Sequence, residues 1–209
     1  MAAVSFPLRP MQQMHWRKYT AELLGTGILT FAVLTALKYS LPLSVPVVAG
    51  LTLGLLVYVL GQISGAHVNP AVTIGLWSIR KMDTWEALKY VVAQVLGAVI
   101  VLKAAPYALG DLPVLTVSAS GTILFAEALG AFVFLLGVCA VVHNKVSSGA
   151  SGLAIGGSLL LGILLAMATS NGVLNPAVAI GIGSASWAYL LGPIVGGVVA
   201  CWVYKWMAR

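Results

Sequence analysis

Long apolar stretches separated by short polar segments dominate this chain of 209 residues. A helix that crosses a bilayer needs about 20 mostly apolar residues, and six stretches come close to that length. The pattern therefore predicts six membrane-spanning helices, with ends that hydropathy fixes only to within a few residues. We place these helices at 19–38, 44–63, 85–106, 119–142, 151–169 and 186–206.

Two further apolar runs, at about 70–79 and 176–184, are too short to cross a bilayer. Each run follows an Asn and begins with Pro in the triplet Asn-Pro-Ala. Asn is a good helix N-cap and Pro a good first helical residue, so each triplet predicts the start of a half-helix. Such backbone survives at membrane depth only when it packs against protein or faces a cavity. Two matching half-helices therefore indicate a pore or a transport site.

The composition is typical of a chain that lies in a lipid bilayer. Hydrophobic residues make up 60% of it, charged residues only 8%, and the mean hydropathy is +1.02, whereas soluble chains carry roughly a quarter charged residues. We expect an integral membrane protein with one channel or transport domain, residues 1–209. Residues 1–18 are polar and basic, without an apolar core and cleavage site, so the first span is expected to be retained.

Basic residues fall mostly on one side of the six predicted spans, and only Lys38 and Lys103 fall on the other. Because cytoplasmic loops carry an excess of Lys and Arg, we expect both termini to be cytoplasmic and the membrane to be a plasma (inner) membrane. This asymmetry accounts for the net charge of +6, so we expect no nucleic-acid partner. The residues on the basic side are Arg9, Arg17, Lys18, Arg80, Lys81, Lys89, Lys145, Lys205 and Arg209.

The two halves of the chain, about 18–106 and 119–207, repeat one another. The sequence Ala-Glu-Leu-Leu-Gly around Glu22 matches Ala-Glu-Ala-Leu-Gly around Glu127, and each glutamate precedes its Asn-Pro-Ala triplet by a similar distance. Three spans per half is an odd number, so the halves must lie in the membrane with opposite topology. The amino ends of the two half-helices then meet near the midplane.

The meeting point has a chemistry that follows from two helix ends. Each half-helix directs a positive dipole end, roughly half an elementary charge, at the centre, and this repels cations and hydrated protons. Asn69 and Asn175 would each present an amide NH2 to the lumen, where it can donate to a water or hydroxyl oxygen. A single-file water that accepts from both amides cannot easily keep a continuous proton-hopping chain.

The segments Ser-Gly-Ala-His-Val-Asn-Pro-Ala-Val-Thr at 64–73 and Leu-Asn-Pro-Ala at 174–177, with Glu22 and Glu127 ahead of them, resemble the major intrinsic protein family of aquaporins and glycerol facilitators. The resemblance covers about residues 18–207. It implies an all-α membrane fold with six transmembrane helices and two re-entrant half-helices in an inverted 3+3 repeat. It also implies a pore in every protomer, a homotetramer in the lipid bilayer and passive conduction of water or small uncharged solutes. The pore motifs are Asn69, Pro70, Ala71, Asn175, Pro176 and Ala177.

One departure from the family pattern concerns selectivity. Most members carry Arg directly after the second triplet, where this chain has Val178. The resemblance places the rest of the selectivity constriction at Ala49, Ile163 and Gly172. The ring is then small and apolar, without Arg, His or an aromatic residue, and should be wider and less discriminating than a strict water filter. We expect it to pass water with ammonia, urea or peroxide, and glycerol as far as size allows.

Polar groups inside the membrane each have two interpretations. Glu22 and Glu127 could form a proton or ion relay, but we favour a structural role in which they accept hydrogen bonds from backbone N–H groups of the irregular loops. Family resemblance supports the structural role. His67 either lines the pore or packs within its loop. Gly50 and Gly54 have the small-xxx-small spacing of close helix packing.

A secondary transporter is the main alternative to a channel, since inverted repeats with broken helices also build transporters. Against it, the sequence offers no intramembrane Asp or Arg to pair with or exchange a driving ion. We expect no enzymatic activity, because no nucleophile, base and orienting group converge. We expect no cofactor or metal either, and Cys139 and Cys201 are typical of small buried apolar positions.

Overall fold

Six long helices account for most of the chain, in a computed structural model that describes residues 14–39, 41–113, 115 and 117–209. Each long helix is apolar and long enough to span a membrane, and each coincides with a predicted span. A short 3-10 turn, η2 (Ser148–Ala150), leads into the fifth of them. The six helices are α1 (Met14–Lys38), α2 (Val45–Ser64), α4 (Thr84–Leu109), α5 (Gly121–Val142), α6 (Ser151–Ala166) and α8 (Trp187–Met207).

Two half-helices, α3 (Pro70–Ser78) and α7 (Pro176–Gly181), begin at the predicted triplets. Asn69 is the N-cap of α3, and its side chain accepts a hydrogen bond from the N–H of Ala71. Asn175 caps α7 in the same way and accepts from Ala177 and Val178. Pro occupies the first helical position of both helices, where its missing N–H costs nothing.

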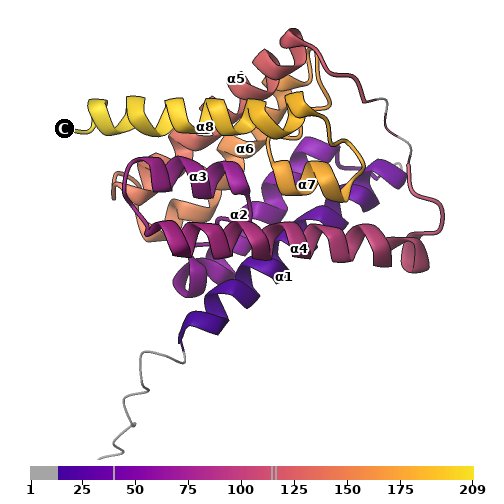
Figure 1. Ribbon diagram of the computed structural model, residues 1–209, viewed down its shortest axis with the longest axis horizontal. Helices are drawn as coiled ribbons and strands as arrows, with labels where there is room; N and C mark the ends of the chain where they lie inside the picture. The colour runs from indigo at the N-terminus through magenta and orange to yellow at the C-terminus, as the bar shows by residue number, and fades with distance from the viewer. Residues whose placement is uncertain (1–13, 40, 114, 116) are drawn as a thin grey trace, which may run out of the picture.

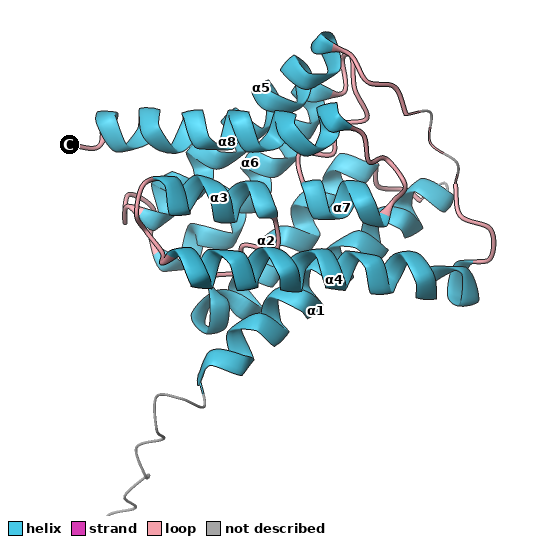
Figure 2. Cartoon of the chain, in the orientation of Figure 1, coloured by secondary structure: helices cyan, strands magenta, loops and turns pink. Residues whose placement is uncertain are grey.

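The half-helices lie end to end in the middle of the bundle. Figure 1 shows α3 and α7 in one line between α4 and α8, with their amino ends facing each other. The loops that lead into them run into the interior of the bundle (Figure 2), and the described part of the chain contains no strand. We call the side where α1 begins and α8 ends the terminal side, and the opposite side the far side. The α3 half-helix then belongs to the terminal side and α7 to the far side.

Two helices end earlier than the hydropathy pattern predicts. α6 stops at Ala166 instead of 169, because residues 167–170 turn back, and the N–H of Ser170 donates to Ala166 O at 3.0 Å. α7 stops at Gly181 instead of 184. There the chain reverses at Gly183, whose φ of +73° lies in the left-handed region that favours glycine. In both places a tight turn ends the helix. Apolar residues can form such a turn, so the hydropathy pattern does not show where the helix ends.

Glycines allow the long helices to approach closely. A Cβ added to Gly50 would lie 2.7 Å from the carbonyl oxygen of Gly156, and one added to Gly54 would lie 2.8 Å from that of Gly152. The contact therefore brings the backbones of α2 and α6 together without an intervening side chain, as small-xxx-small spacing predicts. The contact holds α2 directly against α6.

Large apolar side chains cover the outside of the bundle. Leu51, Leu55, Phe125 and Leu153 are among the exposed ones, as expected for helices that face lipid. Tryptophans gather near the helix ends, where an interfacial aromatic belt would place them. These tryptophans are Trp16, Trp85, Trp187 and Trp206.

We predict that Gly54→Ala destabilises the protein, because the new methyl group would press on the Gly152 backbone. Overpacking of this kind costs about 1–3 kcal/mol. Gly61→Ala on the same helix is the matched control, since a Cβ there meets no atom within 4 Å, and alanine favours a helix over glycine by roughly 1 kcal/mol. Thermal unfolding of the purified variants in detergent measures both effects. Equal melting temperatures for the two variants would contradict the close contact.

Candidate pore

The two N-cap asparagines tie the half-helices together. Nδ2 of Asn69 donates to the carbonyl oxygen of Leu174 at 3.0 Å, and Nδ2 of Asn175 donates to that of Val68 at 2.9 Å. Each asparagine thus caps its own half-helix with its oxygen and binds the opposite loop with its nitrogen. An amide NH2 carries two N–H groups, so one N–H of each asparagine serves this bond and the second remains for a molecule in the lumen. The sequence alone predicts that the whole NH2 group faces the lumen, and the bonds to the opposite loops reduce this to one N–H per asparagine.

The loops before the two asparagines are strained in the same way. Val68 and Leu174, which directly precede them, have φ values of +41° and +54°. Ala66 and Gly172, two residues further back, also have positive φ, at +49° and +63°. Positive φ is unfavourable for non-glycine residues, most of all for a β-branched one such as valine. The surroundings must therefore hold both loops in place.

Glu22 and Glu127 contact these strained loops. Oε1 of Glu22 accepts from the N–H of His67 at 3.0 Å, and Oε2 accepts from the N–H of Val68 at 2.7 Å. Glu127 accepts at its Oε2 from the N–H of Leu174, also at 2.7 Å. Both carboxylates are fully buried. Each one therefore binds the backbone N–H of the residue that directly precedes a pore asparagine.

Hydroxyl and amide groups complete the surroundings of the two carboxylates. Ser64 Oγ donates to Glu22 at 2.7 Å, and Gln94 Nε2 donates to it at the same distance. On the other side Ser170 Oγ donates to Glu127 at 2.8 Å, and the N–H of Val173 donates to it at 3.0 Å. These hydrogen bonds offset part of the cost of burying the two carboxyl groups.

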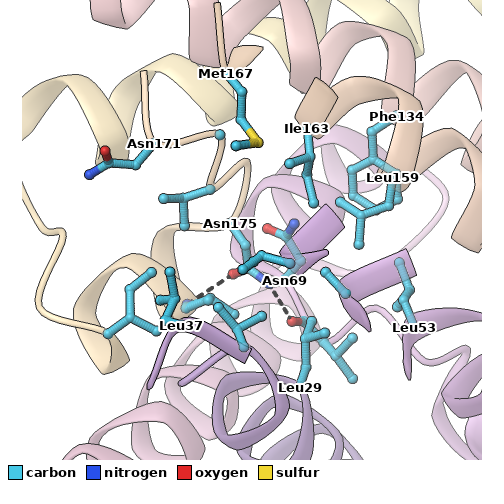
Figure 3. Close-up of a pocket in the computed structure, with 18 of the residues that line it drawn as sticks. Leu29, Leu37, Leu53, Asn69, Phe134, Leu159, Ile163, Met167, Asn171 and Asn175 are labelled. Atoms are coloured by element: carbon cyan, nitrogen blue, oxygen red, sulfur yellow. Dashed lines mark hydrogen bonds between the residues drawn. The ribbon is translucent and has the colours of Figure 1, made fainter. Parts of the chain in front are cut away.

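A cavity of about 210 Å³ opens from the asparagine pair towards the far side. The structure brings the four predicted constriction residues together in its lining: Ala49 from α2, Ile163 from α6, Gly172 from the loop and Val178 from α7. Figure 3 shows the two asparagines side by side in this cavity, with Ile163 next to Met167 at its edge. We call this space the outer cavity.

A second cavity of about 290 Å³ lies on the terminal side. We call it the inner cavity. His67 lines both cavities, and its Nδ1 also lies 3.1 Å from Thr73 Oγ1, with its ring edge-on to Tyr90 at 5.2 Å between centroids. Both interpretations of His67 therefore hold in the structure, because the ring packs within its loop and faces the lumen. None of the described residues that line the two cavities carries a permanent charge.

Residues 10–204 match the major intrinsic protein family. The chain belongs to that family. It is 35% identical to glycerol uptake facilitator protein-like 6 of Lactiplantibacillus plantarum, over 91% of this chain and 98% of the relative. It is also 35% identical to nodulin-26 of Glycine max, over 90% of this chain and 77% of the relative. A probable aquaporin of Archaeoglobus fulgidus is 31% identical, over 92% and 97%.

A solved structure agrees in fold. The aquaglyceroporin of Plasmodium falciparum superposes with a TM-score of 0.70 at 24% identity, over 91% of this chain and 96% of that one. This major intrinsic protein therefore has the aquaporin-like, all-helical fold. Family membership makes it an integral membrane channel for water or small neutral solutes, and not an enzyme.

Several pore-lining residues were not identified from the sequence. Leu53 lies one helical turn after Ala49, and Leu159 lies one turn before Ile163. Helical spacing from the constriction positions could have found both, since residues four apart share a face. Phe134 was missed as well, two turns after Glu127 on α5.

Met167 is a further missed residue, at the edge of the outer cavity. A Cβ on Gly172 would lie 2.7 Å from its Cγ, so the thioether side chain covers the glycine in the ring. Met167 lies in the turn after α6, although hydropathy predicts helix up to residue 169. Helical spacing therefore places its side chain wrongly.

The two cysteines lie away from the pore. Cys139 and Cys201 are buried with free thiols, and their sulfur atoms are 3.5 Å apart. Neither lines the inner or the outer cavity. Within the described part of the chain, no three His, Cys, Asp or Glu side chains come close enough to hold a metal ion.

We predict that Glu127→Gln lowers stability, because an NH2 group replaces one of the two oxygens and leaves the N–H of either Val173 or Leu174 without its acceptor. A buried unsatisfied N–H costs about 1–3 kcal/mol. The control is Glu86→Gln, which removes the half-exposed ion pair with Lys18, a loss typically below about 1 kcal/mol. Thermal unfolding measures both variants. A stable Glu127→Gln protein whose flux has lost a dependence on the proton gradient would favour the relay instead.

Proposed function

We propose that this channel conducts water together with small neutral solutes such as ammonia, urea and hydrogen peroxide, and glycerol as far as size allows. The observation that carries the proposal is the ring around the outer cavity. Ala49, Ile163, Gly172 and Val178 line it from four different segments, and their side chains are apolar or absent. An apolar ring without a cation neither binds water tightly nor selects solutes by charge, so size governs what enters.

Exclusion of ions rests on the helix ends in this proposal. The lining of both cavities contains no permanently charged side chain within the described residues. The partial positive charges at the amino ends of α3 and α7 face the lumen beside the asparagines, and they repel cations there. An arginine at position 178 would add a full charge to this barrier, and Val178 does not supply it.

The relatives support the range of solutes. One similar protein is named for glycerol uptake and another as a probable aquaporin, at 35% and 31% identity. One name refers to glycerol and the other to an aquaporin. For this chain the proposed range of solutes therefore rests on the residues of the constriction and not on either name.

We further propose that both termini lie in the cytoplasm, that the membrane is the plasma (inner) membrane and that the channel is a homotetramer built from two inverted repeats. The described basic residues at the terminal side, such as Arg80, Lys81 and Lys145, support the orientation. Arg9 belongs to the same predicted group but lies outside the described residues. Family membership supports the tetramer, because the resemblance implies it.

We predict that the purified chain in proteoliposomes raises water, ammonia and urea flux above that of bare lipid. The flux should be linear in the gradient and depend weakly on temperature, because a pore has no carrier cycle. Stopped-flow light scattering measures water and urea, and an entrapped pH dye measures ammonia. Water flux no faster than bare lipid would refute the channel function, and saturating solute flux would favour a secondary transporter.

Val178→Arg should narrow and charge the ring. We predict that urea and glycerol flux falls by about tenfold, which corresponds to about 1.4 kcal/mol of added barrier, while water flux falls less. Val178→Met is the matched variant, since it adds length without charge and separates size from electrostatics. If Val178→Arg leaves solute permeation unchanged, the ring is not the selectivity constriction.

A further inference from the structure

The outer and inner cavities meet at a small set of residues. Only Leu53, His67 and Phe134 line both of them among the described residues. These three side chains therefore lie at the junction of the two cavities. His67 places this junction close to the pore asparagines, because it is two residues before Asn69 in the same loop.

Phe134 is the largest side chain of this set. It comes from α5 and Leu53 comes from α2, so the two reach the junction from different helices. Their exposed fractions are 1% and 2%, so both are packed on nearly all sides. Figure 3 shows Phe134 and Leu159 beside the asparagine pair, with Leu53 close by. The outer ring, in contrast, includes a glycine and an alanine, Gly172 and Ala49.

The backbone that carries Phe134 cannot easily retreat. The carbonyl oxygen of Phe134 accepts a hydrogen bond from Ser158 Oγ of α6 at 3.1 Å. One turn later Gly137 packs directly on Ser158, and a Cβ on that glycine would collide with the Ser158 side chain. α5 and α6 are thereby held together at the height of the junction. His67 is held as well, by Thr73 and Tyr90.

We propose that Phe134 limits the size of the solutes that cross this channel, at the junction of the two cavities that it lines together with Leu53 and His67. The inference rests on the proposed function, since it concerns the selectivity of that same pore. The apolar constriction on the far side admits small neutral solutes. The phenyl group of Phe134 then sets how fast urea and glycerol pass relative to water. Its apolar face offers no hydrogen bond to replace lost hydration, so bulkier polar solutes face the larger barrier.

The test compares solute flux with water flux in proteoliposomes of the full chain. We expect Phe134→Leu to raise the ratio of urea and glycerol flux to water flux, and Phe134→Ala to raise it further, by roughly tenfold, equivalent to about 1.4 kcal/mol of barrier. Leu53→Ala, at the same junction, should raise the same ratio. Phe125→Ala is the matched control on the same helix, because Phe125 is 65% exposed on the outside of the bundle, and it should leave the ratio unchanged.

The outcomes separate this proposal from the proposed function. Phe134→Leu keeps an apolar side chain of similar size and is expected to fold; its water flux and elution as a single species show that it does. Should its ratio, and that of Leu53→Ala, equal the wild-type ratio while water flux persists, the size limit lies elsewhere and the proposal is overturned. Absence of water flux in the wild type would instead refute the channel function itself.

Discussion

Two crossed hydrogen bonds, from Asn69 to Leu174 and from Asn175 to Val68, hold the centre of this molecule together. Irregular backbone at membrane depth must find partners within the protein, because lipid offers none. Here each loop finds them in the other loop and in a buried carboxylate. The asparagines cap their helices and tie the loops with a single amide each, so that two short helices meet end to end without a covalent link. The six long helices surround this contact.

The same constraint accounts for the buried acids and for the character of the lumen. Val68 and Leu174 are held at positive φ, and each donates its N–H to a glutamate oxygen at 2.7 Å. The two carboxyl groups therefore lie behind the loops and support them, while the lumen receives amide donors and the positive ends of two helix dipoles. Such a lining favours neutral molecules that accept hydrogen bonds and disfavours cations. The passage of neutral solutes and the exclusion of ions thus follow from one set of contacts.

Much of this arrangement could be predicted from the sequence, because its signals are local. Asn followed by Pro marks the start of α3 and α7, and the run length shows that neither can cross the bilayer. The ends of α6 and α7 could not be predicted, since they depend on turns that apolar residues also form. Phe134 could not be predicted for a different reason. α5 is apolar on nearly all sides, so its sequence has no polar face that would show which side turns towards the lumen. Its packing against α6 and α8 decides this.

The account depends on a continuous wet path that passes the asparagine pair inside a single subunit. On that path, we propose, the outer ring admits solutes and the centre of the pore sorts them by size. The most direct measurement is an experimental structure of the protein in lipid, at a resolution that reveals ordered water. We predict a file of waters from the outer to the inner cavity, with one water within hydrogen-bond distance of Nδ2 of both Asn69 and Asn175. Asparagines that lie far apart, or a dry gap sealed by Phe134 and Leu53, would contradict the account.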